Sequence, residues 1–169
     1  MKMTNKKELF ETIQFAIQEI EYELRALDKG IFFAPELYIA FKIGLNIYKN
    51  RKSIFFGKNA KWLRETSFAK GTIADIAFEV DGTKCVFELK IRSTGSSYES
   101  DIKKLQALKD INEKYFIALV DCFDEGEDGR IPILDTLSAP ERHYKSIIET
   151  NYFINYKKPL HCELHILEV

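Results

Sequence analysis

Residues 72–91 read TIADIAFEVDGTKCVFELKI, and this stretch predicts a β-hairpin. Two apolar-rich runs flank Asp81-Gly82, a dipeptide favoured in two-residue hairpin turns. With that turn, Glu79 lies opposite Lys84 and forms a favourable pair of opposite charges. A slip of one residue would lose this pair and move every side chain to the other face. The turn and the charge pair therefore predict one register.

The predicted register places two carboxylates side by side. Asp75 faces Glu88, and the Cβ atoms of directly opposed residues lie about 5 Å apart. The two charges repel each other, so either one carboxyl stays protonated or a cation lies between them. Lys90 shares their face, and Mg²⁺ or Mn²⁺ would offset more charge because these ions prefer oxygen ligands. The other face is apolar and is expected to form the core: Ala74, Ile76, Phe78, Val80, Cys85, Phe87, Leu89 and Ile91.

The rest of the chain alternates between helical and strand-like patterns. Apolar residues at helical spacing predict the first helix, and Asn5 with Glu8 resembles a capping box at its start. The fold class predicted is α/β (α+β), with a central mixed β-sheet flanked by helices. The expected helices are residues 5–27, 35–49, 99–113 and 140–150, and the expected strands are 61–68, 72–80, 83–91, 115–122 and 161–168.

Length and composition indicate one globular domain over residues 1–169. With 46% apolar residues the chain can build a core without disulfides, and its three cysteines are far apart, as expected for a reducing compartment. A formal net charge of −1 excludes a histone-like polycation. No apolar run approaches the roughly 18 residues that a membrane span needs. We therefore expect a soluble cytoplasmic protein with no membrane partner.

The pattern Asp75, twelve further residues, then Glu88-Leu89-Lys90 resembles the PD-(D/E)xK nuclease superfamily. Ala74 stands where the family name has proline. The resemblance implies a restriction-endonuclease-like core with an added N-terminal helix. The corresponding divisions are an N-terminal helical extension over 1–30, a nuclease-like core over 35–122 and C-terminal additions over 123–169.

By this resemblance the chain is a metal-dependent nuclease that hydrolyses phosphodiester bonds, with DNA as the expected substrate. Asp75, Glu88 and the Leu89 carbonyl would bind Mg²⁺ or Mn²⁺. Lys90 would orient or help deprotonate the attacking water and stabilise phosphate charge. Glu36 would supply the glutamate that many members carry on the preceding helix. Such chemistry needs a hydroxide at neutral pH and a clamp on phosphate oxygens, and a carboxylate-held divalent ion provides both.

Several basic residues are candidates for nucleic-acid contacts. Residues 42–70 contain eight basic residues against Glu65 alone, with Phe55, Phe56 and Trp62 among them. Phosphate binding with base stacking would use such a surface. The alternative is a solvated basic surface whose aromatic rings point into the core. The candidates are Lys103, Lys104, Arg92, Lys58, Lys61 and Arg64. Family members that cut both strands often dimerise, and the apolar helix at 5–27 would serve a homodimer.

The acidic residues also have structural interpretations. Asp75, Glu88 and Lys90 could form a salt bridge on a solvated sheet face. Glu36 is favoured in the first turn of a helix by the helix dipole alone. A second function is therefore a non-catalytic nucleic-acid-binding or assembly subunit on the same fold, as in a restriction or defence complex. A third is an unrelated interaction domain.

One further group of residues is of the types that bind zinc. His161, Glu163 and His165 alternate along the last predicted strand. They could bind zinc, but an exposed edge strand with polar side chains outward is the preferred interpretation. Cys85 and Cys122 are expected to be core packing residues.

Overall fold

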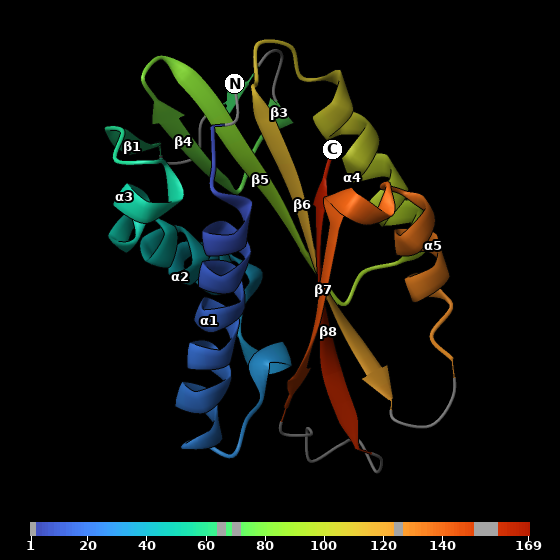
Figure 1. Cartoon of the computed structure of the whole chain (residues 1–169). Coiled ribbons are helices and arrows are strands. Elements are labelled where there is room, and N and C mark those ends of the chain that lie inside the picture. The colour runs from blue at the N-terminus through green and yellow to red at the C-terminus, as the bar shows by residue number, and fades with distance from the viewer. Residues whose placement is uncertain (1–2, 64–66, 69–71, 124–126, 151–158) are drawn as a thin grey trace.

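A six-stranded mixed sheet forms the centre of the structure, a computed structural model that describes residues 3–63, 67–68, 72–123, 127–150 and 159–169 (Figure 1). β5 and β6 are parallel, and all other neighbours are antiparallel. Two short strands, β2 (Ser67–Phe68) and β3 (Thr72–Ile73), pair separately. In order across the sheet, the strands are β1 (Ala60–Leu63), β4 (Ile76–Val80), β5 (Thr83–Ile91), β6 (Glu113–Phe123), β8 (Leu160–Glu168) and β7 (His143–Glu149).

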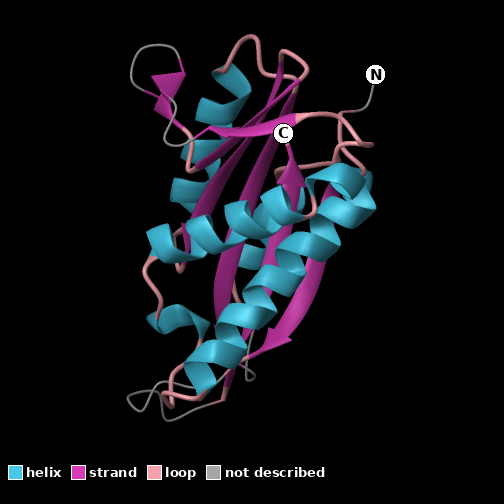
Figure 2. Ribbon diagram, turned by 90° about the vertical axis from the view of Figure 1, so that its left-hand side faces the viewer, coloured by secondary structure: helices cyan, strands magenta, loops and turns pink. Residues whose placement is uncertain are grey.

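Helices cover both faces of this sheet. Figure 1 shows α1, α2 and α3 on one side and α4 and α5 on the other, and Figure 2 shows helices crossing in front of the strands. This arrangement confirms the α+β class with a mixed sheet flanked by helices. The helices are α1 (Lys6–Arg25), α2 (Glu36–Lys49), α3 (Arg51–Ile54), α4 (Gly95–Ala107) and α5 (Arg130–Thr136), with single 3₁₀ turns at Ile31–Phe33 and Pro140–Arg142.

The hairpin register is the predicted one. Val80 pairs with Thr83 and Glu79 with Lys84, and the ladder continues to Ile76 opposite Phe87. The expected strand over 72–80 is interrupted, however, because the chain bends at Asp75 before β4 begins. The bend also breaks the alternation of side chains. Ala74 therefore joins the core on the opposite face from Ile76, and its predicted place on the first face is wrong.

The second face of the hairpin is covered rather than solvated. Ala77 and Val86 lie on that face and are buried against Tyr98 and Ile102 of α4. The first face packs against α1 and α2, as its apolar residues predict. The alternation of charged residues concealed this second core, because only small apolar side chains lie between the charges.

α1 belongs to the first core. Its apolar residues Leu9, Ile13, Ile17 and Ile20 are fully buried, so the face expected to mediate a homodimer lies inside the chain. The capping box at Asn5 is not formed, because the Asn5 side chain makes no cap hydrogen bond. Among the described segments, no helix combines the length and the hydropathy that crossing a bilayer would require.

Three predicted elements differ in the structure. The helix expected at 99–113 begins at Gly95, because the Thr94 hydroxyl accepts a hydrogen bond from the Ser97 N–H and caps the helix. The helix expected at 140–150 is mostly strand β7, which pairs with β8 along its whole length. β8 is consequently an interior strand, and the prediction that it is an exposed edge strand is wrong.

Candidate active site

The candidate site forms where β5 continues beyond the start of β4. The β4–β5 ladder stops at Ile76 and Phe87, although β5 extends to Ile91. Beyond the ladder, a side chain replaces the backbone partner of β5: Asp75 Oδ2 accepts a hydrogen bond from the Leu89 N–H at 2.8 Å. The Glu36 carboxylate at the start of α2 lies close enough to the Ile91 N–H for that group to lower its pKa.

The Leu89 carbonyl points to the same edge of β5. The N–H and C=O of one strand residue point to the same side, since hydrogen-bonded pairs in antiparallel sheets use both groups. Because the Leu89 N–H meets Asp75, the Leu89 carbonyl is also directed beyond the end of β4. Asp75, Glu36 and one main-chain oxygen thus converge on a single gap in the sheet. In a purely structural role, the carboxylates would only satisfy N–H groups of β5 that β4 leaves unpaired.

Glu88 and Lys90 project from β5 toward α4. Lys90 Nζ lies 3.3 Å from Glu88 Oε1 and 3.5 Å from Asp101 Oδ2. Asp101 is a buried α4 residue that also binds Lys104 Nζ at 2.6 Å. Sequence reasoning missed Asp101, although its place three residues after buried Tyr98 predicts an inward orientation.

Burial and mutual repulsion raise the pKa values of the carboxyl groups. Burial, followed by the negative charge of Asp75, raises the pKa of Glu88 to about 7, against the lowering effect of Lys90. Burial is also the main cause of the raised pKa values of Asp75 and Glu36. For Lys90, burial lowers the pKa, but Glu88 and Asp101 outweigh it and the net shift is upward. The ammonium group is therefore charged at neutral pH and shared among several carboxylates.

The oxygen-rich set is suited to Mg²⁺ or Mn²⁺ by ligand type. In the structure, the carboxylate oxygens of this set lie farther apart than the ligand atoms around a bound metal ion. Among the described residues, the groups that bring three ligand atoms within 4.8 Å of one another do not include Asp75, Glu88 or Glu36. The Glu88 carboxylate forms an ion pair with Lys90 instead. Joint binding of one ion would require these carboxylates to change rotamer and draw together.

The predicted nucleic-acid contacts are dispersed. Lys104 lies beside the site through Asp101, and Lys103 is exposed on the same helix. Arg92 Nε instead contacts Asp121 Oδ2 at 3.2 Å, near the C-terminal end of the neighbouring strand β6. Lys61 lies on edge strand β1, and Lys58 precedes it; Arg64 lies outside the described residues.

An aromatic hollow opens beside Asp75. Its volume is about 670 Å³, and its walls include Tyr38 and Phe41 of α2 and Trp62 of β1. The Trp62 ring stacks on Phe78 at 6.1 Å between centroids. Trp62 was a candidate for stacking, whereas Tyr38 and Phe41 were missed because their exposure depends on how α2 packs.

The other aromatic candidates have different surroundings. Phe55 is fully buried in the first core, as the core interpretation of that stretch predicts, while Phe56 is exposed. Lys42, from the same basic stretch, is paired with Glu19 and Glu23 of α1. The basic stretch therefore does not act as one continuous surface.

Asp75, Glu88 and Lys90 thus lie together around the gap, and Asp101 contacts Lys90 from α4. Comparison with known proteins finds no matching family model, no matching curated protein and no matching solved structure.

Proposed function

We propose that the protein is a metal-dependent nuclease of the PD-(D/E)xK type, with a restriction-endonuclease-like core and DNA as the expected substrate. The observation that carries the proposal is the Asp75 carboxylate bonded to the Leu89 N–H beside the Glu88–Lys90 pair. This places an acid, a main-chain carbonyl and a charged amine around one gap in the sheet. A cytoplasmic location is part of the proposal.

The residues have distinct roles in this mechanism. Asp75, Glu88 and the Leu89 carbonyl would hold Mg²⁺ or Mn²⁺, with Glu36 as a further carboxylate at the gap. The ion would supply a water of lowered pKa and charge stabilisation for the phosphate. Because its own pKa is raised, Lys90 is a hydrogen-bond donor that orients the water and stabilises phosphate charge, rather than a base.

The aromatic hollow supports a substrate with unpaired bases. Tyr38, Phe41 and Trp62 line a space that Asp75 also lines. Bases stack on such rings with little sequence preference, at about 1–3 kcal/mol per base. A strand with its phosphate near Asp75 would place a neighbouring base against these rings, so cleavage of single-stranded DNA is expected to exceed cleavage of duplex DNA.

Cleavage assays on plasmid and single-stranded DNA with Mg²⁺ or Mn²⁺ test the proposal. We expect Asp75→Asn and Lys90→Met each to reduce the rate by at least about 100-fold, since each removes a preorganised group. Glu79→Gln is the matched control, because it neutralises a β4 carboxylate that pairs with Lys84 away from the gap. Full activity in both site variants would refute the mechanism.

A non-catalytic binding module on the same fold is the second candidate. The observation in its favour is the Lys90 ammonium, which already bridges Glu88 and Asp101. Calorimetry with Mn²⁺ separates the two functions, because a binding module would show no ion uptake at millimolar concentration. A homodimer stays a prediction; it would need a surface other than the buried face of α1, and sedimentation would detect it.

A further inference from the structure

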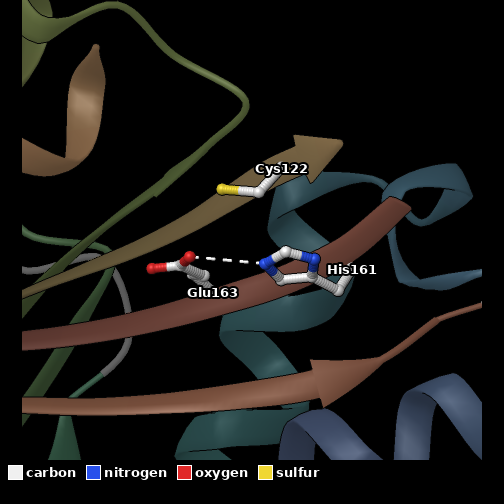
Figure 3. Close-up of side chains that lie close together, drawn as sticks. All are labelled: Cys122, His161 and Glu163. Atoms are coloured by element: carbon white, nitrogen blue, oxygen red, sulfur yellow. Dashed lines mark hydrogen bonds and ion pairs between the residues drawn. The ribbon is translucent and has the colours of Figure 1, made fainter. Parts of the chain in front are cut away.

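A second group of side chains lies on the face of the sheet that α4 and α5 cover, at the end of β6 and the start of β8 (Figure 3). Cys122 and His161 are direct partners in the β6–β8 ladder, and Glu163 lies two residues along β8. Directly opposed residues share a face, as do residues two apart on one strand. The register therefore brings a thiol, an imidazole and a carboxylate together without a loop.

We propose that Cys122, His161 and Glu163 form a binding site for a transition metal ion, Zn²⁺ in particular. One ligand atom from each residue lies within 4.8 Å of the other two. The His161 Nε2 to Glu163 Oε1 distance is 3.3 Å. Two ligands of a tetrahedral zinc ion with bonds of about 2.0–2.1 Å lie roughly 3.3–3.4 Å apart. This pair already has the required spacing.

The donor set separates this site from the gap at β5. Sulfur and imidazole ligands favour zinc and related metals, whereas the carboxylates around Asp75 favour Mg²⁺. His161 and Glu163 side chains are each 23% exposed, so an ion can reach the site from solvent. Cys122 is buried beneath them. Three protein ligands leave a fourth position for water.

Glu163 is also held in place by its second oxygen. His165 Nε2 lies 3.2 Å from Glu163 Oε2, and His165 Nδ1 lies 2.9 Å from His143 Nε2. A carboxylate accepts hydrogen bonds, so the His165 N–H donates to it. Metal-binding carboxylates commonly have such partners, which fix their orientation. The oxygen that faces His161 is thereby kept in position for an ion.

A neighbouring trio is a weaker site. Asp135, His143 and His165 also bring three ligand atoms within 4.8 Å of one another. Their atoms are already engaged, because the two imidazoles bond to each other and Asp135 pairs with Lys145. An ion there would have to break both interactions.

Titration of the metal-free 169-residue chain tests the proposal. Zn²⁺ is followed by calorimetry and Co²⁺ by absorption, and we expect one ion per chain with the thiolate-to-cobalt charge-transfer band of a tetrahedral site. Cys122→Ser should abolish this band, and His161→Gln should weaken Zn²⁺ binding more than about tenfold. Cys162→Ala is the matched control, since that β8 thiol faces the opposite core and should leave the band unchanged.

Three results would overturn the proposal. The first is no Zn²⁺ binding at micromolar concentration. The second is a charge-transfer band that survives Cys122→Ser in a variant whose circular dichroism is native. The third is binding that His161→Gln leaves intact but His143→Gln removes, which would assign the ion to the neighbouring trio. Because the readouts are calorimetric and spectroscopic, none depends on nuclease activity.

Discussion

His143 couples the stability of the fold to pH. Its side chain is 4% exposed, and its Nε2 lies 2.9 Å from His165 Nδ1. Burial, followed by repulsion from His165, lowers the pKa of His143 to about 4. The unfolded chain takes up this proton near pH 6.5, whereas the folded chain resists it. The stabilisation is therefore complete above pH 6.5 and is lost as the pH falls toward 4.

We expect His143→Gln to make the protein less sensitive to acid. Between pH 7 and pH 4.5 the free energy of unfolding of the natural chain should fall about 1–2 kcal/mol further than that of the variant. Urea denaturation at a series of pH values measures both. Ile147→Thr, which alters an exposed β7 side chain without changing any charge, serves as the comparison. Parallel pH profiles for the natural chain and His143→Gln would contradict the prediction.

Single residues of the candidate site were predictable where strand geometry alone positions them. The hairpin register as far as Ile76 and Phe87 follows from the two-residue turn, but the bend at Asp75 does not, and Asp75 binds the Leu89 N–H instead of pairing with Glu88 in the ladder. Glu36 followed from the apolar stripe of its own helix. Asp101 did not, because its contact with Lys90 depends on how α4 lies over the sheet, which no local pattern encodes.

The packing of α2 on β1 depends on a glycine. A Cβ atom at Gly44 would lie 2.4 Å from the Trp62 ring, closer than any real contact. Replacing an interior helix glycine by alanine normally stabilises a protein by about 0.5–1 kcal/mol. Here overpacking should reverse the sign, because such strain costs about 1–3 kcal/mol.

We expect Gly44→Ala to lower the free energy of unfolding and to displace Trp62. Trp62 is the single tryptophan, so its fluorescence reports the shift directly. Urea denaturation gives the stability change, and Lys49→Ala on the exposed side of α2 is the control. A more stable Gly44→Ala protein with unchanged emission would show that the ring and helix adjust without strain.

Elements were predictable where one periodicity dominates the sequence. α1, α2, the hairpin, β6 and β8 all match expected segments within a few residues. β7 was predicted as a helix because apolar and polar residues do not alternate regularly along it. Its neighbouring residues Ile147 and Ile148 are both apolar, although Ile147 is 67% exposed and Ile148 is buried. Its strand conformation comes from pairing with β8, a contact between segments whose adjacency the sequence does not reveal.

At the scale of the whole molecule, α1 and the residues before it connect the N-terminal segment to the sheet. Lys6 pairs with Glu168 near the C-terminus, and the Thr4 hydroxyl bonds to Glu113 Oε2 at 2.6 Å at the start of β6. At the other end of α1, the Arg25 guanidinium donates a hydrogen bond to the Glu149 carbonyl of β7 at 3.0 Å. α1 is thus tied to the sheet at both ends, which bears on the predicted division of the chain at residues 1–30.

We expect a fragment of residues 31–169 to fail to fold on its own. Burying Leu9, Ile13, Ile17 and Ile20 contributes on the order of 6–12 kcal/mol, at about 1.5–3 kcal/mol per side chain. A domain of this size has a net stability of only about 5–15 kcal/mol, so losing α1 would remove most or all of it. The exposed sheet face should bind a hydrophobic dye, and urea unfolding should lose its cooperativity.

Leu9→Ala in the 169-residue chain provides a milder comparison, because it should lower the free energy of unfolding by about 2–5 kcal/mol. Cooperative unfolding of the fragment would instead establish residues 1–30 as a separate extension, because the remaining core would then suffice without α1.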